Sequence, residues 1–292
     1  MQITIENDKL SLTVDTHGAQ MMSIRSKADG TEYLWQGDPG IWADRAPVLF
    51  PVIGRLWGRE HLVQGEKYPM GLHGFACNAE FIPLVKEGNR LSLALCPSRE
   101  IEKQFPYELC LQISYLLHDD EVFVTTKVGN MGEKTMPFAI GGHPGFRVPL
   151  CEGESFEDYT LEFTHPCHPE RIGFSEEVLM NCSDSLFPLE EDRRLDLRHS
   201  LFDDDAIILR NADREVTLRS RKSGRGVTVS YPQMAYVGFW HMPKTEAPYV
   251  CIEPWTGLPG RQNITEDLTC RSDYLQLPPD GICENRWIIR TF

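Results

Sequence analysis

The sequence predicts an all-β protein in which largely antiparallel sheets pack face to face as a large sandwich. Segments with alternating apolar and polar residues, many of them β-branched, recur along the whole length of the 292 residues. Turn-forming residues separate nearly all of these segments, and helical signals are few. Many strands with few helices bury their apolar faces by packing sheet on sheet. No linker, charge block or internal repeat divides the chain, so we expect a single domain over residues 1–292.

The expected strands follow one another along the chain. A meander at 2–6, 10–14 and 20–25 is followed by two hairpins, which pair 80–85 with 91–96 and 107–117 with 121–128. Polar turn residues at 87–89 and 118–120 connect the strands of each hairpin. The later strands are expected at 159–163, 206–209, 215–220, 226–231, 235–240, 249–252 and 287–290.

Only two segments carry helical signals. Ser98 can cap a short helix over 98–105, and Pro106 ends it because proline cannot continue the hydrogen-bond ladder. A weaker pattern predicts a single turn at 265–268. The least regular segment, 171–201, is expected to be a loop.

Composition excludes several classes of partner. The formal net charge of −14 would repel the phosphates of nucleic acids and the headgroups of anionic membranes. The first residues show no basic stretch followed by an apolar run, and no apolar segment reaches membrane-spanning length, so we expect a cytoplasmic protein. The nine cysteines form no CxxC pair and are odd in number, which favours reduced, mostly buried thiols over a disulfide framework.

Two histidines stand in similar settings, His73 in Gly71-Leu72-His73-Gly74-Phe75 and His143 in Gly141-Gly142-His143-Pro144-Gly145-Phe146. The neighbouring glycines allow another group to approach the backbone closely. From the residues alone, a catalytic imidazole and a buried imidazole bonded to a backbone carbonyl are about equally good interpretations. The pair His165 and His168 has metal-ligand spacing but no clear third ligand, so no metal site is predicted.

One glutamate has a comparable setting. Glu253 follows the apolar run 249–252 and precedes Pro254-Trp255-Thr256-Gly257. A glutamate at the end of a buried strand is partly desolvated, which raises its pKa toward the range of a useful general base. The alternatives are an ordinary loop glutamate or one paired with Arg261. Trp255 could stack on the apolar face of a sugar ring, and Phe75 offers a second flat face.

Two more residues are candidates for binding hydroxyl groups. Arg55 ends a long apolar run, and its guanidinium offers a rigid fork of donors. Asp205 precedes the strand expected at 206–209 and could accept hydrogen bonds from neighbouring sugar hydroxyls. Asp203 and Asp204 adjoin it, and a solvated acidic turn explains all three equally well. The sequence contains no dinucleotide, Walker, zinc-protease or nucleophile-elbow motif.

Taken together, four motifs resemble those of the aldose 1-epimerase (galactose mutarotase) superfamily, and most closely those of its LacX-like branch. The resemblance runs from about Ile3 to the C-terminus. The order and wide spacing of the motifs make the match specific, although no single motif would suffice. They are Pro47-Val48-Leu49-Phe50-Pro51-Val52-Ile53-Gly54-Arg55-Leu56, Leu72-His73-Gly74-Phe75-Ala76, Gly142-His143-Pro144-Gly145-Phe146 and Ile252-Glu253-Pro254-Trp255-Thr256-Gly257.

This resemblance implies a β-supersandwich and an isomerase that interconverts the α and β anomers of a free aldose, with no cofactor. It implies Glu253 as the catalytic base and His143 as the catalytic acid. His73 would polarise the ring oxygen, while Arg55 and Asp205 would bind hydroxyls. The expected partner is a small sugar, and the protein is expected to be a monomer or a homodimer.

Two positions depart from the best-known mutarotases. Those enzymes follow the second histidine with threonine or serine, where this chain has Pro144, and follow the substrate aspartate with histidine or asparagine, where it has Ala206. The departures leave the choice of sugar open. Alternative functions are a sugar-phosphate epimerase, a non-catalytic sugar-binding or sensor protein, and a glycosidase, which would normally need two carboxylates beside the scissile bond. The sugar-phosphate reaction would require cations near the mouth of the site, and Arg25, Arg45 and Arg59 are candidates.

Overall fold

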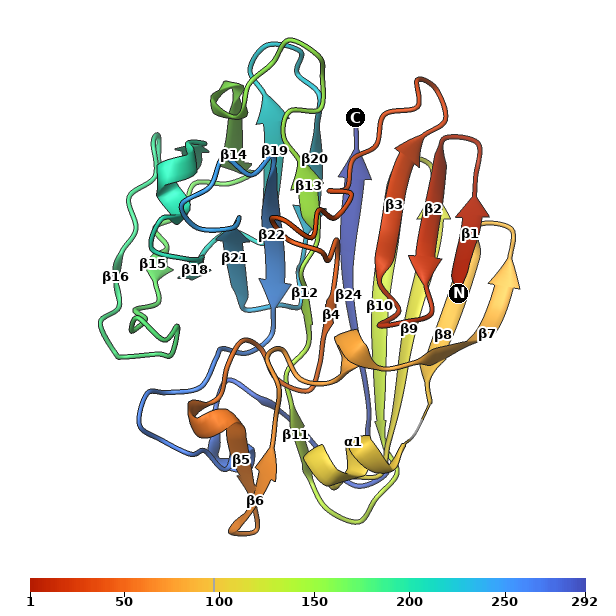
Figure 1. Cartoon of the computed structure of the whole chain (residues 1–292), viewed down its shortest axis with the longest axis vertical. Coiled ribbons are helices and arrows are strands. Elements are labelled where there is room, and N and C mark those ends of the chain that lie inside the picture. Colours follow the sequence, from red (N-terminus) through yellow and green to blue (C-terminus); the bar gives the residue numbers. More distant parts are fainter. Residues whose placement is uncertain (97) are drawn as a thin grey trace.

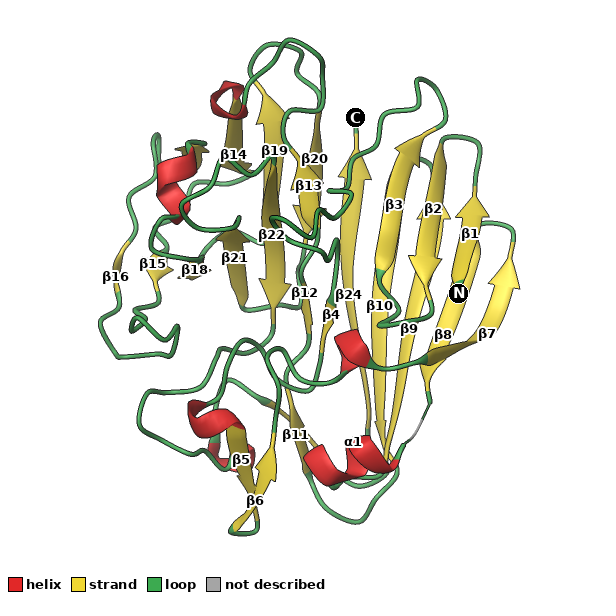
Figure 2. Cartoon of the chain, in the orientation of Figure 1, coloured by secondary structure: helices red, strands yellow, loops and turns green. Residues whose placement is uncertain are grey.

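The structure is a computed structural model that describes residues 1–96 and 98–292, and strands dominate it (Figure 1, Figure 2). The larger of its two main sheets has nine strands, and each neighbouring pair is antiparallel. Their order in the sheet is β17 (Arg194–Asp196), β14 (Tyr159–Phe163), β19 (Glu215–Ser220), β20 (Gly226–Ser230), β24 (Ile282–Thr291), β10 (Glu121–Asn130), β9 (Leu109–His118), β8 (Arg90–Leu95) and β7 (Phe81–Glu87).

The second main sheet has eight strands, is also antiparallel, and carries the candidate site. Its order is β16 (Ser185–Leu186), β15 (Glu170–Arg171), β18 (Ile207–Arg210), β21 (Tyr236–Trp240), β22 (Tyr249–Trp255), β12 (Gly141–Gly142) and β4 (Val48–Leu49), and β13 (Gly145–Arg147) also pairs with β22. All seven residues of β22 are buried.

Three small sheets and a few short helical segments complete the fold. The meander of β1 (Gln2–Glu6), β2 (Leu10–Asp15) and β3 (Met21–Ser26) lies beside the nine-stranded sheet (Figure 1). The Tyr115 hydroxyl of β9 donates a 2.6 Å hydrogen bond to the Ala19 carbonyl, between β2 and β3. Two further pairs are β5 (Glu60–Val63) with β6 (Glu66–Pro69) and β11 (Met136–Phe138) with β23 (Leu275–Leu277). The helical segments are α1 (Arg99–Gln104) and 3₁₀ turns at Trp57–Arg59, Ala76–Asn78, Phe156–Asp158, His199–Phe202 and Leu268–Cys270.

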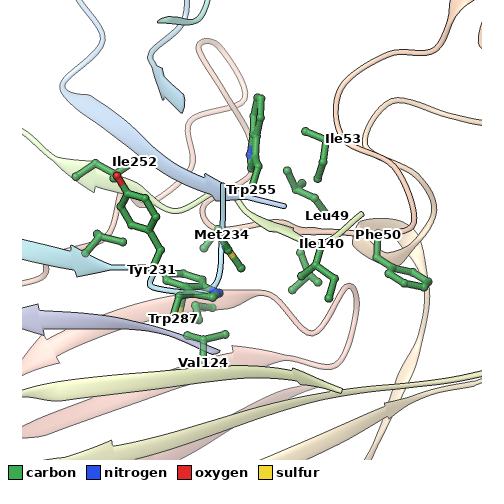
Figure 3. Close-up of a cluster of buried hydrophobic side chains, with 14 of the residues drawn as sticks. Leu49, Phe50, Ile53, Val124, Ile140, Tyr231, Met234, Ile252, Trp255 and Trp287 are labelled. Carbon is green, nitrogen blue, oxygen red and sulfur yellow. The ribbon is translucent and has the colours of Figure 1, made fainter. Parts of the chain in front are cut away.

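The core lies between the two main sheets. Figure 3 shows Val124 and Trp287 of the nine-stranded sheet close to Ile140, Tyr231 and Met234, with Leu49 and Ile252 of the eight-stranded sheet in the same cluster. A second, smaller cluster contains Trp35, Ala247, Tyr249 and Cys251, with Trp42 and Trp240 packed on it. Since Cys251 and Glu253 are two residues apart in β22, they lie on the same face of the strand.

The predicted class is confirmed, and many strand boundaries agree closely with the prediction. The expected strands at 2–6, 159–163 and 215–220 coincide with β1, β14 and β19. Ser98 caps α1 as expected, since its side chain accepts from the Ile101 amide at 3.3 Å. The expected turn at 265–268 is misplaced, because the 3₁₀ turn begins at Leu268, where Asp267 caps it. The segment 171–201 is less irregular than expected, since it contains β16, β17 and the end of β15.

The structure also bears on a membrane-spanning role. Among the described residues, every helix is too short or too polar to cross a lipid bilayer.

Candidate active site

Strand register brings the predicted acid and base together. Gly141 pairs with Trp255 and Gly145 pairs with Cys251, so the register places His143, midway between the glycines, opposite Glu253. The His143 Nε2 and Glu253 Oε2 atoms lie 3.3 Å apart. Both residues are deeply buried, with 7% and 2% of their surfaces exposed. Two groups 110 residues apart in sequence thus meet where the short link between β12 and β13 runs beside β22.

The glycines around His143 have specific packing roles. A Cβ atom on Gly142 would lie 2.6 Å from the Trp287 ring, and one on Gly145 would lie 2.8 Å from the Trp42 ring. Real Cβ atoms do not approach other atoms so closely. The two glycines therefore allow one indole to pack beneath the strand and another to pack beside His143.

A left-handed turn positions His73. Its φ is +60°, a region that residues other than glycine adopt infrequently, and a Cβ on the following Gly74 would lie 2.2 Å from the Phe50 carbonyl oxygen. The His73 amide donates to the Gly54 carbonyl at 2.8 Å, and the Gly54 amide donates to His73 Nδ1 at 3.1 Å. Since Nδ1 accepts, the proton of the neutral ring is on Nε2. The His73 and His143 rings are 5.4 Å apart, centroid to centroid, and nearly perpendicular.

Burial and nearby charge keep both histidines neutral. Burial lowers the pKa of His73 to about 4, with a further contribution from the positive charge of Arg55. The pKa of His143 is held well below its ordinary 6.5, first by burial and then by the effect of His73. An imidazole with a low pKa is a strong acid once it is protonated.

The shift of Glu253 has the opposite direction. Burial raises the pKa of Glu253 well above its ordinary 4.5, the negative charge of Asp205 adds to the rise, and the nearby indole of Trp255 opposes it. The two directions favour a protonated Glu253 beside a neutral His143, so that the pair holds a single proton. Adding a second proton would leave a buried imidazolium, and removing the first would leave a buried carboxylate.

This shared proton predicts an unusual pH dependence of stability. Above pH 4.5 the unfolded chain ionises Glu253 while the folded protein keeps the proton, so this residue destabilises the fold increasingly as pH rises. Glu253→Gln removes that penalty. Its folding equilibrium constant, relative to that of the parent, should increase with pH above 4.5, by at most about tenfold for each pH unit. Urea unfolding at several pH values measures the ratio, and a ratio independent of pH would contradict the assignment.

Arg55 and Asp205 each act on a different candidate residue, since the charge of Arg55 acts on His73 and the charge of Asp205 acts on Glu253. Arg55 is exposed, and its guanidinium donates to the Glu177 carbonyl at 3.1 Å. Asp205 is half-buried with φ +72°, and its Oδ1 accepts from the Ala206 amide at 2.8 Å. Its neighbours Asp203 and Asp204 are exposed. Of the three aspartates, Asp205 is the one whose charge influences Glu253, which favours it as the inward-facing residue.

The two predicted aromatic contacts need correction. Phe75 is 5% exposed, and its ring packs edge-on against Phe50 at a centroid distance of 5.7 Å and in a tilted arrangement against Phe105 at 6.1 Å. We therefore assign Phe75 to the core instead of the substrate site. Trp255 is 3% exposed, so it offers no open ring face for stacking on a sugar. Its buried indole nitrogen forms no hydrogen bond of normal geometry in the described structure, and the nearest effect of the indole is on Glu253, whose pKa it lowers.

Two other tryptophans line the site, and sequence reasoning missed them. The ring of Trp42 lies 5.1 Å from that of His143, and the ring of Trp240 lies 5.6 Å from it. The two indoles are 5.4 Å apart in an edge-to-face arrangement, and both are only partly buried. The available signals were a tryptophan in the irregular segment before Pro47 and another at the end of a predicted strand. Neither pattern separates a site residue from a surface one.

One group of metal-ligating side chains coincides with this site. His143, Cys251 and Glu253 each bring one donor atom within 4.8 Å of the others, and all three are buried. A cation held there would occupy the imidazole nitrogen and the carboxylate oxygen that acid–base chemistry requires. Burial also raises the pKa of the Cys251 thiol well above its usual range, and an ionised Glu253 would add to the rise, which disfavours the thiolate that a metal would need.

Comparison with known proteins agrees with this geometry. The family model described as aldose 1-epimerase matches residues 1–269. The plasmid-encoded protein LacX of Lactococcus lactis subsp. lactis is 38% identical over 279 residues, which cover 91% of this chain and 92% of the relative. Among solved structures, a galactose mutarotase related enzyme from Lactobacillus acidophilus superimposes with a TM-score of 0.95 at 32% identity, covering 100% of this chain and 97% of the other.

A galactose mutarotase-like protein from Lactobacillus casei ATCC 334 gives a TM-score of 0.93 at 31% identity, with both chains fully covered. The predicted resemblance is therefore confirmed, including the relation to LacX. The sheet topology, the motifs and the match along most of the sequence agree, and the chain belongs to the aldose 1-epimerase family.

Proposed function

We propose that this protein is an aldose 1-epimerase that interconverts the α and β anomers of a free sugar by opening and closing the ring. The observation that carries the proposal is the direct approach of Glu253 to His143, with His73 beside them. These groups supply one base, one acid and one neutral hydrogen-bond donor. Ring opening is neither a redox reaction nor a group transfer, so the described side chains suffice for the proton transfers.

The reaction begins with a proton transfer inside the pair. Moving the shared proton from Glu253 to His143 gives a carboxylate and an imidazolium without exchange with solvent. The carboxylate takes the proton from O1 while the imidazolium gives its proton to O5, and the C1–O5 bond breaks to leave an aldehyde. Since O1 and O5 are bonded to the same carbon, an acid and a base in contact can reach both oxygens. Rotation about C1–C2 and the reverse transfers then close the other anomer.

Both pKa shifts favour these transfers. A carboxylate whose pKa is raised binds the O1 proton more strongly, and an imidazolium whose pKa is lowered releases its proton to the weakly basic ring oxygen more readily. Burial is the first cause of both shifts. It disfavours the ionised forms of Glu253 and His143, and for that reason makes the carboxylate a stronger base and the imidazolium a stronger acid. His73 remains neutral above about pH 4 and can donate from Nε2 to the ring oxygen.

The indole pair gives the site an apolar wall, with Trp42 and Trp240 beside the acid. A pyranose has C–H groups on its faces that pack on an aromatic ring. Gly145 follows Pro144, which stands where the best-known mutarotases have threonine or serine, and the missing side chain of Gly145 makes the space that Trp42 occupies. The departure from the family pattern thus exchanges a polar contact to substrate for an apolar one.

Trp42→Ala tests this wall. We expect the KM for hexoses to rise about five- to tenfold, as for the loss of one aromatic contact of roughly 1 kcal/mol, while kcat changes less than threefold. Gly145→Ala should also raise the KM for hexoses, because the added methyl group would displace the Trp42 indole. Trp57→Ala is the matched control, since Trp57 is partly buried in a different segment. A Trp42 variant with the parent's KM would exclude a role in binding.

Polarimetry tests the proposed function itself. Freshly dissolved α-glucose and α-galactose should approach equilibrium faster in proportion to added protein, and glucose 6-phosphate should serve as the comparison substrate. No acceleration for any of them would refute the proposal and favour a non-catalytic binding protein. Two of the three cations considered for a phosphate are engaged elsewhere, since Arg45 donates to the Met22 carbonyl and to Gln36, and Arg25 donates to the Gly30 carbonyl.

A further inference from the structure

Two histidines that the proposed reaction does not use lie in direct contact with each other. His241 directly follows β21 and is fully buried, whereas His199 begins the 3₁₀ turn His199–Phe202 and is partly buried. The Nδ1 atom of His199 lies 3.1 Å from the Nε2 atom of His241. This imidazole–imidazole hydrogen bond joins two segments that are 42 residues apart in sequence.

A backbone carbonyl determines the proton positions of the pair. His241 Nδ1 lies 2.8 Å from the Met242 carbonyl oxygen, which can only accept, so this nitrogen carries the proton. Nε2 of the neutral ring is therefore an acceptor, and His199 Nδ1 donates to it. Burial lowers the pKa of both imidazoles, which favours the neutral rings that this arrangement requires. The hydrogen bonds thus run in one direction, from His199 through His241 to the Met242 carbonyl.

Aromatic rings hold the two imidazoles in place. The Phe156 ring stacks on that of His199 at a centroid distance of 4.0 Å, and the Phe202 ring lies 4.5 Å from that of His241. Both phenylalanines are buried. Close packing restricts rotation of the imidazoles, so the hydrogen bond between them has a defined geometry.

His241 is connected to the indole wall of the site. It directly follows Trp240, whose ring lies 5.6 Å from that of the proposed acid. The Met242 amide donates to the Tyr249 hydroxyl at 3.1 Å, and the Tyr249 ring stacks on that of Trp42 at 5.3 Å. A change in the position of His241 would therefore be transmitted to both indoles through direct contacts.

His199 belongs to the turn that leads to Asp205. The Asp205 amide donates to the Phe202 carbonyl at 3.0 Å, so Asp205 is bonded to the last residue of the turn that His199 begins. The ladder of β18 with β21 starts only at Ile207, after this turn. The two histidines therefore connect the Asp205 turn to the end of β21 at a point that the strand ladder does not reach.

We propose that His241 and His199 are positioning residues of the proposed epimerase, which hold the indole wall and the Asp205 turn at the separation that a sugar requires. The proposal rests on the proposed function, in which these two groups bind different parts of the substrate. Neither imidazole is needed for proton transfer, which the proposed acid and base perform. Loss of the hydrogen bond between the histidines should therefore weaken sugar binding and leave the chemical step nearly unchanged.

Substitutions that keep or remove the donor of His199 test this role. His199→Asn places an amide N–H near the position of Nδ1, so its KM for hexoses should stay within twofold of the parent's. His199→Leu has a similar volume and no donor. It should raise KM about five- to tenfold, because the loss of one buried hydrogen bond reduces the fraction of molecules with an aligned site, while kcat changes less than threefold.

Substitution of the acceptor should give the same result. His241→Asn keeps a donor for the Met242 carbonyl but does not reach His199, so it should raise KM about five- to tenfold. The double variant His199→Leu/His241→Asn should match the more impaired single variant, since both changes break the same bond. A KM raised by the product of the two single effects would overturn the shared role.

His61→Asn is the matched control. His61 is also a buried imidazole in contact with a backbone carbonyl, so its replacement should lower the melting temperature and leave KM unchanged. An unchanged KM in folded His199→Leu and His241→Asn would overturn the positioning role. A rise in His199→Asn as large as that in His199→Leu would also overturn it, because the effect would not depend on the donor.

A binding measurement separates failure of this proposal from failure of the reaction. Methyl β-galactoside and methyl β-glucoside cannot open their rings, so calorimetry reports binding alone, and His199→Leu should weaken it five- to tenfold while His199→Asn should not. This pattern in a protein that accelerates no anomer exchange would refute the reaction and retain the positioning role. Equal glycoside binding by the parent and all variants, with accelerated exchange, would retain the reaction and overturn the positioning role.

Discussion

Glu253→Gln is expected to lower kcat for anomer exchange by roughly 10²–10⁴-fold, the usual contribution of a general base. The amide has the shape of the carboxyl group but cannot take the O1 proton. The KM should change little, because the substituted side chain still fits its place opposite His143. Saturation-transfer NMR of equilibrated galactose measures the exchange rate without a coupled enzyme.

Another buried glutamate provides the matched control. Glu266 is 4% exposed and pairs with Arg271 and with Arg261. Glu266→Gln breaks a structural ion pair, so it should lower the melting temperature and leave kcat of the folded protein unchanged. Glu253→Gln should give the opposite signature, with lost activity and a fold at least as stable at neutral pH. If Glu253→Gln retained the parent's kcat, this residue would not be the base.

The second large effect on kcat is expected when His143, the proposed acid, is replaced. His143→Asn should lower kcat by roughly 10²–10⁴-fold, because asparagine can donate a hydrogen bond to the ring oxygen but cannot transfer a proton to it. The double variant Glu253→Gln/His143→Asn should lose no more activity than the more impaired single variant, since the two residues act as one proton-transfer unit. Additive losses would contradict the shared proton.

His61 serves as the control for His143. It is also buried, with 1% of its surface exposed, and its Nε2 lies 2.8 Å from the Gln104 carbonyl oxygen. Burial likewise lowers its pKa. His61→Asn should reduce stability without changing kcat. If the His61 and His143 variants lost the same fraction of activity, the effect at His143 would be structural.

The fold class and the proximity of the three candidate catalytic residues, His73, His143 and Glu253, were predictable from the sequence for different physical reasons. Period-2 alternation marks strands that bury one face, and it placed β9, β10 and the β7–β8 hairpin closely. The trio depended on motifs in separate segments. Their meeting in space depends on the register of β12 and β13 against β22, which spacing along the chain does not reveal.

The failures share a cause, which is that local pattern carries little information about non-local packing. The short strands β15 and β16 have two residues each, too few for an alternation to be visible. Phe75 adjoins a catalytic candidate in sequence, yet its ring packs in the core against Phe50. The ring of Trp42 packs beside His143, far away in sequence. It can do so because Gly145 has no side chain to occupy the same space.

The most direct test of the account follows oxygen-18 at O1 of galactose during catalysed anomer exchange. If Glu253 and His143 open the ring, the C1–O5 bond breaks and the C1–O1 bond remains. The label should then persist through many interconversions of the α and β forms. Loss of the label to water at the rate of interconversion would show that the C1–O1 bond breaks instead, and would contradict the mechanism.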